Sequence, residues 1–483
     1  MKNYSKYFQK PSLQEEAKRC KERVVVNKEG LLLDEVTKDM GKTKKYFVRT
    51  YGCQGNQADG ETIAGILEFM GYTKANSEED ADVILLNTCA VRENAEDKVY
   101  GEIGSLKRLK TTNPDLIIGI CGCMSQQPHV VDKILQSYPQ VDLVFGTHNI
   151  NRLPLLLKEA YFNKERVVEV FSNNNEIVEN LPMSRDNKYK AWVNIMYGCD
   201  KFCTYCIVPY TRGKERSRLM EDILSEVQSL KDNGYKEITL LGQNVNAYGK
   251  DLNLGYDFAT LLTKVSDIGI DRIRFVTSHP WNFTSEMIDI IANRENIMPY
   301  IHLPIQSGDD EVLRRMGRRY TYKEYKELFD MIREKVKNSS ISTDIIVGFP
   351  GESEEQFENT LRAVRECKYD SAFTFIYSPR VGTPAAKMED NVTMEEKKNR
   401  FDRLVEEVSK SAKESNDRFV GKTVKVLVEG VSKKNKNILS GYSEENKLVN
   451  FKGDPSKVGT IVNVKITTSK TWTLEGEEVG ENC

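Results

Sequence analysis

Three cysteines, Cys199, Cys203 and Cys206, lie within eight residues of one another. A compact loop with this spacing can bring three thiolates to three corners of an iron-sulfur cube. The next cysteine along the chain is Cys367, so no neighbouring thiol is available for the fourth corner. The spacing therefore predicts a 4Fe-4S cluster in which one iron stays open to a further ligand.

A zinc site is the main alternative for this loop. Zinc sites that stabilise a fold usually take four ligands. The chain has only four histidines, and all lie far from the loop in sequence: His129, His148, His279 and His302. We therefore favour the iron-sulfur interpretation.

Three further cysteines, Cys53, Cys89 and Cys123, each stand just beyond a short apolar run. If these runs are parallel strands, their carboxyl ends line one crevice, where ligands ordinarily bind. The three thiols are then expected to share a second cluster site. The alternative is that they are small buried core residues, which would require the same position to recur three times by chance.

Cys121 lies only two residues before Cys123, but it is still inside the apolar run 116–121, where core packing explains it. Gly122 is expected to end the strand and let the backbone turn, which places Cys123 in the loop. Gly52 precedes Cys53 in the same way. The prediction is therefore Cys123, and not Cys121, as the third ligand.

The elements around these cysteines predict a doubly wound α/β domain in the first third of the chain. Continuous apolar runs of this kind are typical of parallel strands buried on both faces, here at 46–50, 83–87, 116–121 and 141–145. Helical periodicity appears between them, at 57–70 and 95–110. Residues 1–43 lack steady periodicity and are interpreted as a variable extension without assigned chemistry.

A second α/β series follows a polar connection at 163–190. Its six expected strands predict a partial, open (β/α)6 barrel: 192–196, 237–241, 272–277, 300–305, 343–347 and 373–377. Beyond a charged helix near 394–416, short β-rich runs indicate a small β-barrel, at 424–428, 448–451 and 460–466. The expected domains are 1–43, 44–162, 185–416 and 418–481.

Composition is that of an ordinary globular chain of several domains, with 483 residues, 39% hydrophobic and 29% charged. No apolar run approaches the roughly 20 residues that span a bilayer, and the polar start lacks the features of an export signal. We expect a cytoplasmic protein without a membrane contact, in which disulfides are improbable and cysteines serve as ligands, catalytic thiols or core. The net charge of -2 does not locate a nucleic-acid site.

The cysteine loop, within Tyr197-Gly-Cys-Asp-Lys-Phe-Cys-Thr-Tyr-Cys-Ile-Val-Pro-Tyr-Thr-Arg-Gly213, resembles the radical S-adenosylmethionine (SAM) superfamily. Three other stretches resemble the N-terminal motifs of its methylthiotransferase family: Tyr51-Gly-Cys-Gln-Gly-Asn56, Asn87-Thr-Cys-Ala-Val-Arg-Glu-Asn94 and Gly122-Cys-Met124. From Phe419-Val-Gly-Lys-Thr423 onward the chain resembles a TRAM domain. The segment Leu241-Gly-Gln-Asn-Val-Asn246 is similar to the members that act on N6-dimethylallyladenosine in tRNA.

This resemblance implies two 4Fe-4S clusters and two uses of SAM. One SAM molecule donates a methyl group to sulfur, and another yields the radical that abstracts hydrogen from C2 of the adenine. The target is the isopentenylated adenosine next to the tRNA anticodon, reached most easily when the base is splayed out. The implied partners are an electron donor such as flavodoxin or ferredoxin and a sulfur or cluster-supply protein, around a monomeric enzyme.

For SAM, the family implies contacts from Tyr205 and from the loops after the second, fourth and fifth barrel strands: Gln243, Asn244, Gln306, Ser307, Gly348 and Glu352. Loop residues at strand ends can equally be turn formers, and Tyr205 can equally be core. For RNA, the basic cluster beside the radical site is a candidate, and its alternative is a solvated loop: Arg212, Lys214, Arg216 and Arg218. Arg314, Arg315, Arg318 and Arg319 carry the same two interpretations. Trp472 could stack on a base or pack in the barrel.

Two other functions compete with this one. A sister subfamily methylthiolates threonylcarbamoyladenosine in tRNA and another modifies an aspartate of a ribosomal protein, and both share the cysteines. A non-catalytic iron-sulfur protein that binds RNA and senses iron or redox state would also explain the cysteines and the β-barrel. It would not explain an open iron, and SAM-dependent formation of 5′-deoxyadenosine would exclude it.

Overall fold

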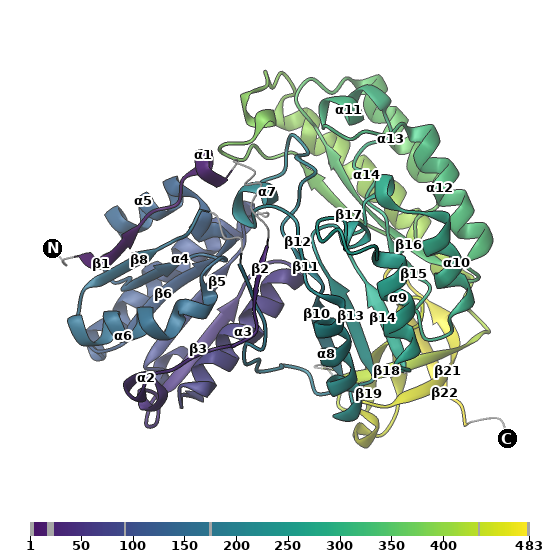
Figure 1. Cartoon of the computed structure of the whole chain (residues 1–483). Helices are drawn as coiled ribbons and strands as arrows, with labels where there is room; N and C mark the ends of the chain where they lie inside the picture. Colours follow the sequence, from purple (N-terminus) through teal and green to yellow (C-terminus); the bar gives the residue numbers. More distant parts are fainter. Residues whose placement is uncertain (1–3, 17–23, 91–92, 173–175, 433–434, 481–483) are drawn as a thin grey trace.

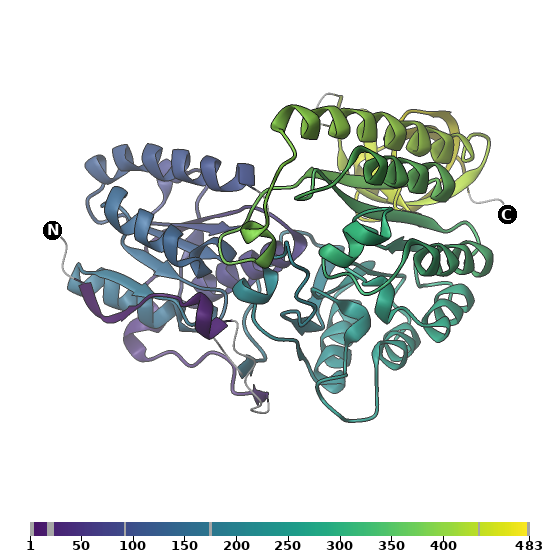
Figure 2. The ribbon, with the colours of Figure 1, turned by 90° about the horizontal axis from the view of Figure 1, so that it is seen from above.

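The computed structural model describes residues 4–16, 24–90, 93–172, 176–432 and 435–480. Three units follow one another along the chain: an N-terminal α/β unit, a central α/β barrel and a C-terminal β-barrel (Figure 1). The view from above shows the N-terminal unit and the central barrel side by side (Figure 2). The predicted fold class is confirmed.

The N-terminal unit is built on a seven-stranded parallel sheet in the order β1-β8-β7-β6-β5-β3-β4. The chain runs from β3 outward to β4, then returns past β3 to β5 and continues. The winding direction thus reverses between β3 and β5, and such a switch point is where ligands bind beyond the carboxyl ends. The strands are β1 (Tyr4–Gln9), β3 (Lys45–Thr50), β4 (Thr73–Lys74), β5 (Val83–Thr88), β6 (Ile117–Gly122), β7 (Leu143–Phe145) and β8 (Arg166–Glu169).

Helices cover both faces of this sheet, as its continuous apolar strands require. On one face, α3 (Gln54–Phe69) and α6 (Leu153–Asn163) bury Ile63, Ile66 and Leu156 against the strands. On the other, α4 (Glu93–Thr112) and α5 (Pro128–Ser137) contribute their own buried side chains, among them Ile103, Leu106 and Val131.

The first 43 residues and the connection at 163–190 differ from expectation. β1 adds a seventh strand beside β8, and β8 itself lies beyond the expected domain end at residue 162. β2 (Val25–Asn27) pairs with β9 (Glu176–Val178), while α1 (Leu13–Glu16) and α2 (Glu35–Asp39) are short. The sequence pattern does not reveal β1, β2 and β9, because short edge strands bury few of their side chains. By contrast, β8 is a fully buried inner strand that the expected domain end at 162 leaves out.

The central unit has the six predicted parallel strands, arranged as two sheets of three. They are β10 (Lys190–Asn194), β13 (Glu237–Leu241), β14 (Arg272–Phe275), β15 (Tyr300–His302), β16 (Ser340–Val347) and β17 (Ser371–Ile376). Seven helices accompany them: α8 (Met220–Asp232), α9 (Phe258–Asp267), α10 (Ser285–Asn293), α11 (Asp310–Arg315), α12 (Tyr322–Lys335), α13 (Glu354–Cys367) and α14 (Met394–Asp417). The last three of these begin at capping boxes, in which a Ser or Thr and a Glu or Gln satisfy the free N–H groups.

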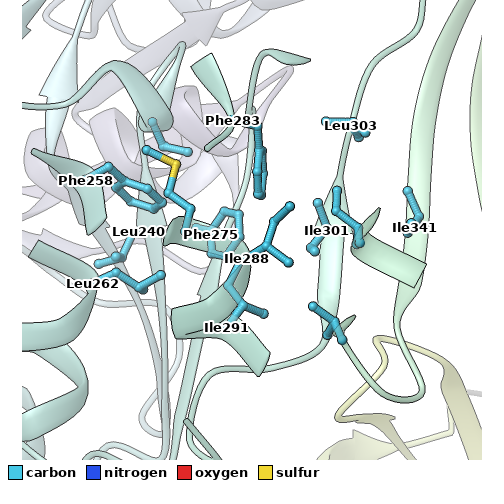
Figure 3. Close-up of a cluster of buried hydrophobic side chains, with 14 of the residues drawn as sticks. Leu240, Phe258, Leu262, Phe275, Phe283, Ile288, Ile291, Ile301, Leu303 and Ile341 are labelled. Atoms are coloured by element: carbon cyan, nitrogen blue, oxygen red, sulfur yellow. The ribbon is translucent and has the colours of Figure 1, made fainter. Parts of the chain in front are cut away.

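The main core lies between the barrel strands and their helices (Figure 3). Alternate strand residues, such as Leu240, Phe275 and Ile301, point outward and meet Phe258 of α9 and Ile288 of α10. The Phe258 and Phe275 rings pack edge to face, with their centroids 5.4 Å apart. Fully burying each such side chain contributes roughly 1.5–3 kcal/mol, which gives the barrel a rigid wall behind its loops.

The C-terminal unit is a closed five-stranded barrel in the order β18-β19-β20-β22-β21. Its strands are β18 (Thr423–Val431), β19 (Ile438–Ser443), β20 (Leu448–Lys452), β21 (Ile461–Ser469) and β22 (Thr473–Glu478). The sequence interpretation missed β19 and β22, which are rich in Ser, Gly and Glu. Among the described helices, none combines the length and the apolarity needed to cross a bilayer.

Candidate active site

Cys53, Cys89 and Cys123 meet at the carboxyl ends of β3, β5 and β6, at the switch point of the sheet. Cys53 precedes α3 as its N-cap residue, Cys89 follows β5 directly, and Cys123 opens the short helix η2 (Cys123–Gln126). The thiol of Cys89 hydrogen-bonds that of Cys53 and is the largest influence lowering the Cys53 pKa to about 5. We call this set the auxiliary cysteines.

Asn56 and Arg212 join the auxiliary cysteines. The Asn56 side-chain oxygen lies 3.7 Å from the Cys53 sulfur and 3.6 Å from the Cys123 sulfur, and its amide nitrogen donates to the backbone of Tyr51 and Thr88. The Arg212 Nε donates to the Cys123 sulfur at 3.2 Å, and its Nη2 donates to Asn56 at 2.9 Å and to Asp59 at 2.6 Å. A buried positive charge therefore sits against these thiols.

Two glycines permit the close approach of the strand ends. Gly52 has a φ of 113° and Gly122 a φ of 90°, a region that side chains rarely adopt. A Cβ at Gly52 would lie 2.4 Å from the Cβ of Cys89, and one at Gly122 would lie 2.5 Å from the backbone oxygen of Thr88. Glycine is required at both positions for the cysteines to converge.

Cys199, Cys203 and Cys206 occupy a loop beyond β10, closed at its base by a small hairpin. The hairpin pairs β11 (Met196–Tyr197) with β12 (Arg216–Ser217), and the Cys199 N–H donates to the Gly213 carbonyl at 3.0 Å. Further along, the Thr204 N–H and hydroxyl donate to the carbonyls of Met316 and Arg315. The backbone thus holds the three thiols, which we call the radical cysteines, independently of any ligand.

The chemistry of both sets fits iron-sulfur clusters. Burial raises the pKa of the Cys199 thiol well above its usual range and that of Cys206 to about 12, so a bound cation is needed to make them thiolates. Arg318 is buried with its Nη1 3.6 Å from the Cys203 sulfur, as Arg212 is at Cys123. Within the described residues, no group of three His, Cys, Asp or Glu side chains is arranged to bind a single metal ion. An iron-sulfur cube does not need that arrangement, because its three thiols bind at separate corners.

The auxiliary and radical cysteines are neighbours across the boundary between the two units. Helix α7 (Val208–Thr211) begins two residues after Cys206 and lies between the units in Figure 1. Its Tyr210 and the preceding Ile207 pack with Ala90 and Cys123 in one apolar cluster. Arg212 follows α7, so one short segment connects the radical loop with the auxiliary thiols.

The SAM contacts predicted after β13 lie at this boundary. A Cβ built on Gly55 of α3 would be 3.4 Å from Nε2 of Gln243 and 3.6 Å from the Cys53 sulfur, so Gln243 faces the auxiliary site. Asn244 is buried and donates to Glu215 at 3.1 Å. Its side-chain oxygen is buried without a hydrogen-bond partner among the described residues, which leaves it available to a ligand.

The other predicted SAM residues are held largely by the protein itself. The Ser307 hydroxyl contacts Thr360 at 3.3 Å, and Glu352 accepts from the Gly348 N–H at 2.7 Å and from Arg400 at 3.2 Å. Burial raises the pKa of Glu352 to about 7. Tyr205 packs against an apolar cluster that includes Phe349. These assignments stay predictions, as does that of Gln306, whose φ of 71° marks a strained loop.

The basic cluster beside the radical loop is not the exposed surface that both of its interpretations assumed. All three arginines of this cluster are buried. Arg218 forms ion pairs with Glu179 and Glu226, and Arg216 donates from its Nη1 to the Glu176 carbonyl. Arg212 lies at the auxiliary cysteines. Each of these three arginines is engaged inside the protein, and their predicted contact with RNA or substrate stays a prediction. Lys214 is partly buried, whereas Trp472 is 54% exposed in the turn between β21 and β22 and stays a candidate.

The sequence interpretation did not single out Asn56 and Arg318 for the cysteine sites. Asn56 stands within the first cysteine motif, and Arg318 belongs to an arginine run whose two interpretations are an RNA contact and a solvated loop. Their positions beside thiols depend on a helix turn and on a loop after β15, and spacing does not reveal either. Val91 and Arg92 of the second motif lie outside the described residues.

Sequence models of known families match each unit of the chain. The radical SAM superfamily matches residues 193–364, the TRAM domain matches residues 417–479, and an uncharacterized protein family, UPF0004, matches residues 45–146. The three matches coincide with the three structural units.

Curated relatives match nearly the full length. A tRNA-2-methylthio-N(6)-dimethylallyladenosine synthase of Bacillus subtilis (strain 168) is 56% identical, over 99% of this chain and 95% of the relative. One of the same name from Geobacillus thermodenitrificans (strain NG80-2) is 57% identical, over 99% of this chain and 92% of the relative.

Among solved structures, the radical S-adenosylmethionine methyltransferase TsrM from Kitasatospora setae is similar in fold. The TM-score is 0.52 at 15% identity, covering 71% of this chain and 77% of that one. The likeness supports the arrangement of the α/β units and carries no further argument.

Proposed function

The chain belongs to the tRNA-2-methylthio-N(6)-dimethylallyladenosine synthase family, and on that premise we propose how its residues divide the reaction. The product is 2-methylthio-N6-dimethylallyladenosine in tRNA, formed by radical SAM chemistry at C2 of the adenine. The observation that carries the proposal is the placement of two three-cysteine sets on either side of α7.

We assign the radical step to Cys199, Cys203 and Cys206, which would hold the 4Fe-4S cluster of the radical SAM domain. When bound, this cluster supplies an open iron for SAM and the electron that cleaves it reductively. The chain's own task is to orient SAM, aim the radical and exclude water. The unpartnered oxygen of Asn244 and the loops after β15 and β16 support SAM binding at this end of the barrel.

We assign the sulfur chemistry to Cys53, Cys89 and Cys123, which would hold a second 4Fe-4S cluster. Their support is the common sheet edge, the contact between two of the thiols, and the guanidinium of Arg212. Such a cluster would carry the sulfur of the methylthio group. A sulfur or cluster-supply protein would renew it, and a flavodoxin or ferredoxin would supply electrons.

The inner face of the barrel offers a surface for the substituted base. β17 pairs with β16 so that Phe373 lies on the same face as Asp344. The rings of His302 and Phe373 pack edge to face, with their centroids 6.1 Å apart. Phe373 and Phe375 remain 51% and 38% exposed there. An exposed aromatic face suits an adenine that carries a dimethylallyl group, because the planar base can stack on it and the dimethylallyl group is apolar.

Nucleoside mass spectrometry of tRNA tests the substrate. A strain without this gene should lack 2-methylthio-N6-dimethylallyladenosine and accumulate N6-dimethylallyladenosine, while methylthiolated threonylcarbamoyladenosine should be unchanged. Retention of the first nucleoside, without a second enzyme that makes it, would overturn the assignment. Loss of the threonylcarbamoyl derivative alone would instead identify the sister activity.

A further inference from the structure

Trp281 is an exposed aromatic residue at the mouth of the radical site. It lies in the short helix η5 (Pro280–Asn282), directly beyond the carboxyl end of β14, and 47% of its surface is exposed. The Lys201 ammonium lies 4.9 Å from the centroid of its ring and the Arg319 guanidinium lies 5.1 Å from it. An exposed indole with two cations on it is an unusual surface for a protein to leave in water.

The two cations are available to a ligand. Other cations of the barrel helices pair with carboxylates, as Arg314 does with Glu311 at 2.6 Å and Lys326 with Asp330 at 2.7 Å. Across the described part of the chain, no ion pair with a carboxylate involves Lys201 or Arg319. Of the arginine run at 314–319, Arg315 is held by the Pro350 carbonyl and Arg318 by the Pro304 carbonyl, whereas the exposed Arg319 rests on the Trp281 ring.

The patch borders the radical cysteines directly. Lys201 lies between Cys199 and Cys203 in the same loop, and Arg319 adjoins Arg318, whose Nη1 contacts the Cys203 sulfur. On the other side, Asn282 accepts a hydrogen bond from Asn244 at 3.4 Å. A nucleotide on the patch would therefore lie beside the position where an adenine must enter.

We propose that Trp281, Lys201 and Arg319 form a binding site for the nucleotide that flanks the target adenosine of the tRNA, an inference that rests on the proposed function. The Trp281 ring stacks on the flanking base, and the two cations contact its phosphates. Because the target adenine must leave its stack to reach the radical site, its neighbour loses a stacking partner, and an aromatic ring at the rim replaces it.

RNA affinity measures this role without requiring turnover. The probe is an anticodon stem-loop RNA carrying N6-dimethylallyladenosine, titrated against the iron-loaded full-length protein at several salt concentrations. Trp281→Ala and Trp281→Leu should weaken binding roughly tenfold, as expected for loss of one stacked base. Trp281→Phe should retain most of the affinity, since it keeps a π face. Arg319→Gln should reduce the slope of log affinity against log salt by about one.

Matched controls are Phe69→Ala, which removes an aromatic residue of similar exposure from the end of α3, and Arg108→Gln, which removes an exposed arginine that pairs with Glu79. Both should bind RNA like the wild type. Iron content is compared for all variants. If Trp281→Ala loses iron, the RNA affinities of the Leu and Phe variants test the stacking role instead. Wild-type affinity in the Trp281→Leu protein, or an unchanged salt slope in Arg319→Gln, overturns the proposal. Absence of methylthiolated product from the wild type would instead count against the proposed function.

Discussion

Each cysteine set has one buried arginine, although the two arginines come from different loops. Arg212 contacts the Cys123 sulfur and also pairs with Asp59, and Arg318 approaches the Cys203 sulfur while donating to the Pro304 carbonyl. Three thiolates that hold a cluster would concentrate negative charge in a site of low dielectric constant, so a fixed guanidinium beside them would be favourable. The spacing of the cysteines alone does not indicate either partner.

Replacement of Arg212 should change the reduction potential of the auxiliary cluster more than that of the radical cluster. Arg212→Gln removes a positive charge next to Cys123, which disfavours the more negative reduced state and should lower its reduction potential by roughly tens of millivolts. Arg212→Lys should restore part of the difference. Redox titration followed by electron paramagnetic resonance measures both clusters in one sample. Equal potentials in the Gln, Lys and wild-type proteins would show that the guanidinium does not tune the site.

The two cysteines near the end of β6 should behave differently. Cys121 is fully buried with its sulfur 3.7 Å from the Leu86 carbonyl, whereas Cys123 meets Arg212 and Asn56. Cys123→Ala should therefore lose about half of the iron after anaerobic reconstitution, and Cys121→Ala should keep nearly all of it. Normal iron in the Cys123 variant together with loss in the Cys121 variant would reverse the ligand assignment.

At the scale of elements, the end of β6 depends on a glycine. In Gly122→Ala, the new Cβ would meet the backbone oxygen of Thr88 at 2.5 Å and the φ of 90° would be strained. We expect a loss of about 2 kcal/mol or more in the free energy of unfolding, with lower auxiliary iron because Cys123 moves. Urea unfolding and iron analysis measure the two effects.

Gly101→Ala is the matched control for Gly122→Ala. It lies in α4, where a Cβ meets no atom within 4 Å. Alanine favours a helix by about 1 kcal/mol relative to glycine, so this variant should be as stable as the wild type or more stable. Similar destabilisation of both variants would contradict a specific requirement for glycine at the end of β6.

At the scale of the whole molecule, buried charges attach the C-terminal barrel to the central one. Arg272 and Arg274, at the start of β14, donate hydrogen bonds to backbone carbonyls of the C-terminal barrel. Arg272 donates to Tyr442 and Lys425, and Arg274 donates to Ser443 and Glu444. Asp370, before β17, binds Arg418 and Lys447. Because these groups are desolvated and paired, separating the barrels would leave several charges unsatisfied, and the C-terminal barrel is held in a fixed position.

Asp370→Asn should loosen this attachment. Burial by itself would raise the pKa of Asp370, but Lys447, Arg333 and Arg418 outweigh it and hold that pKa at about 2. The carboxylate thus contributes stability above pH 4 that is lost as the pH falls through about 2, worth about 2 kcal/mol. The variant should have a free energy of unfolding about 3 kcal/mol lower than the wild type at pH 7. Its free energy of unfolding should also depend less on pH in the acid range.

Urea unfolding at pH 7 and pH 3, followed by near-ultraviolet circular dichroism, checks the prediction for Asp370. The control Asp289→Asn breaks an exposed pair with Lys335 and should cost less than about 1 kcal/mol. Equal stability of the Asp370 variant and the control at pH 7 would contradict a structural role for the buried network.

Removal of iron should loosen the N-terminal unit. Its three auxiliary cysteines come from separate strands, and a ligand that binds only the folded state adds stability by mass action. Limited proteolysis of the iron-free protein should therefore cut faster within residues 46–160 than in the reconstituted protein. The C-terminal barrel contributes none of these cysteines, so its cleavage should be unchanged. Equal cleavage of residues 46–160 with and without iron would contradict the prediction.

The sequence by itself determined the class of the fold, the six barrel strands and the cysteines that directly follow strands. Apolar runs and short-range spacing are local properties of the chain, so they can be read without the structure. Resemblance extended this to the family. The tertiary structure alone decided which distant residues accompany the cysteines. Arg212 and Asn56 meet at Cys123 only because β3, β5 and β6 end at one sheet edge and α7 crosses to it. The same applies to Arg216 and Arg218, whose burial depends on packing between units, and to Trp281, which the fold leaves exposed beside two cations from other loops.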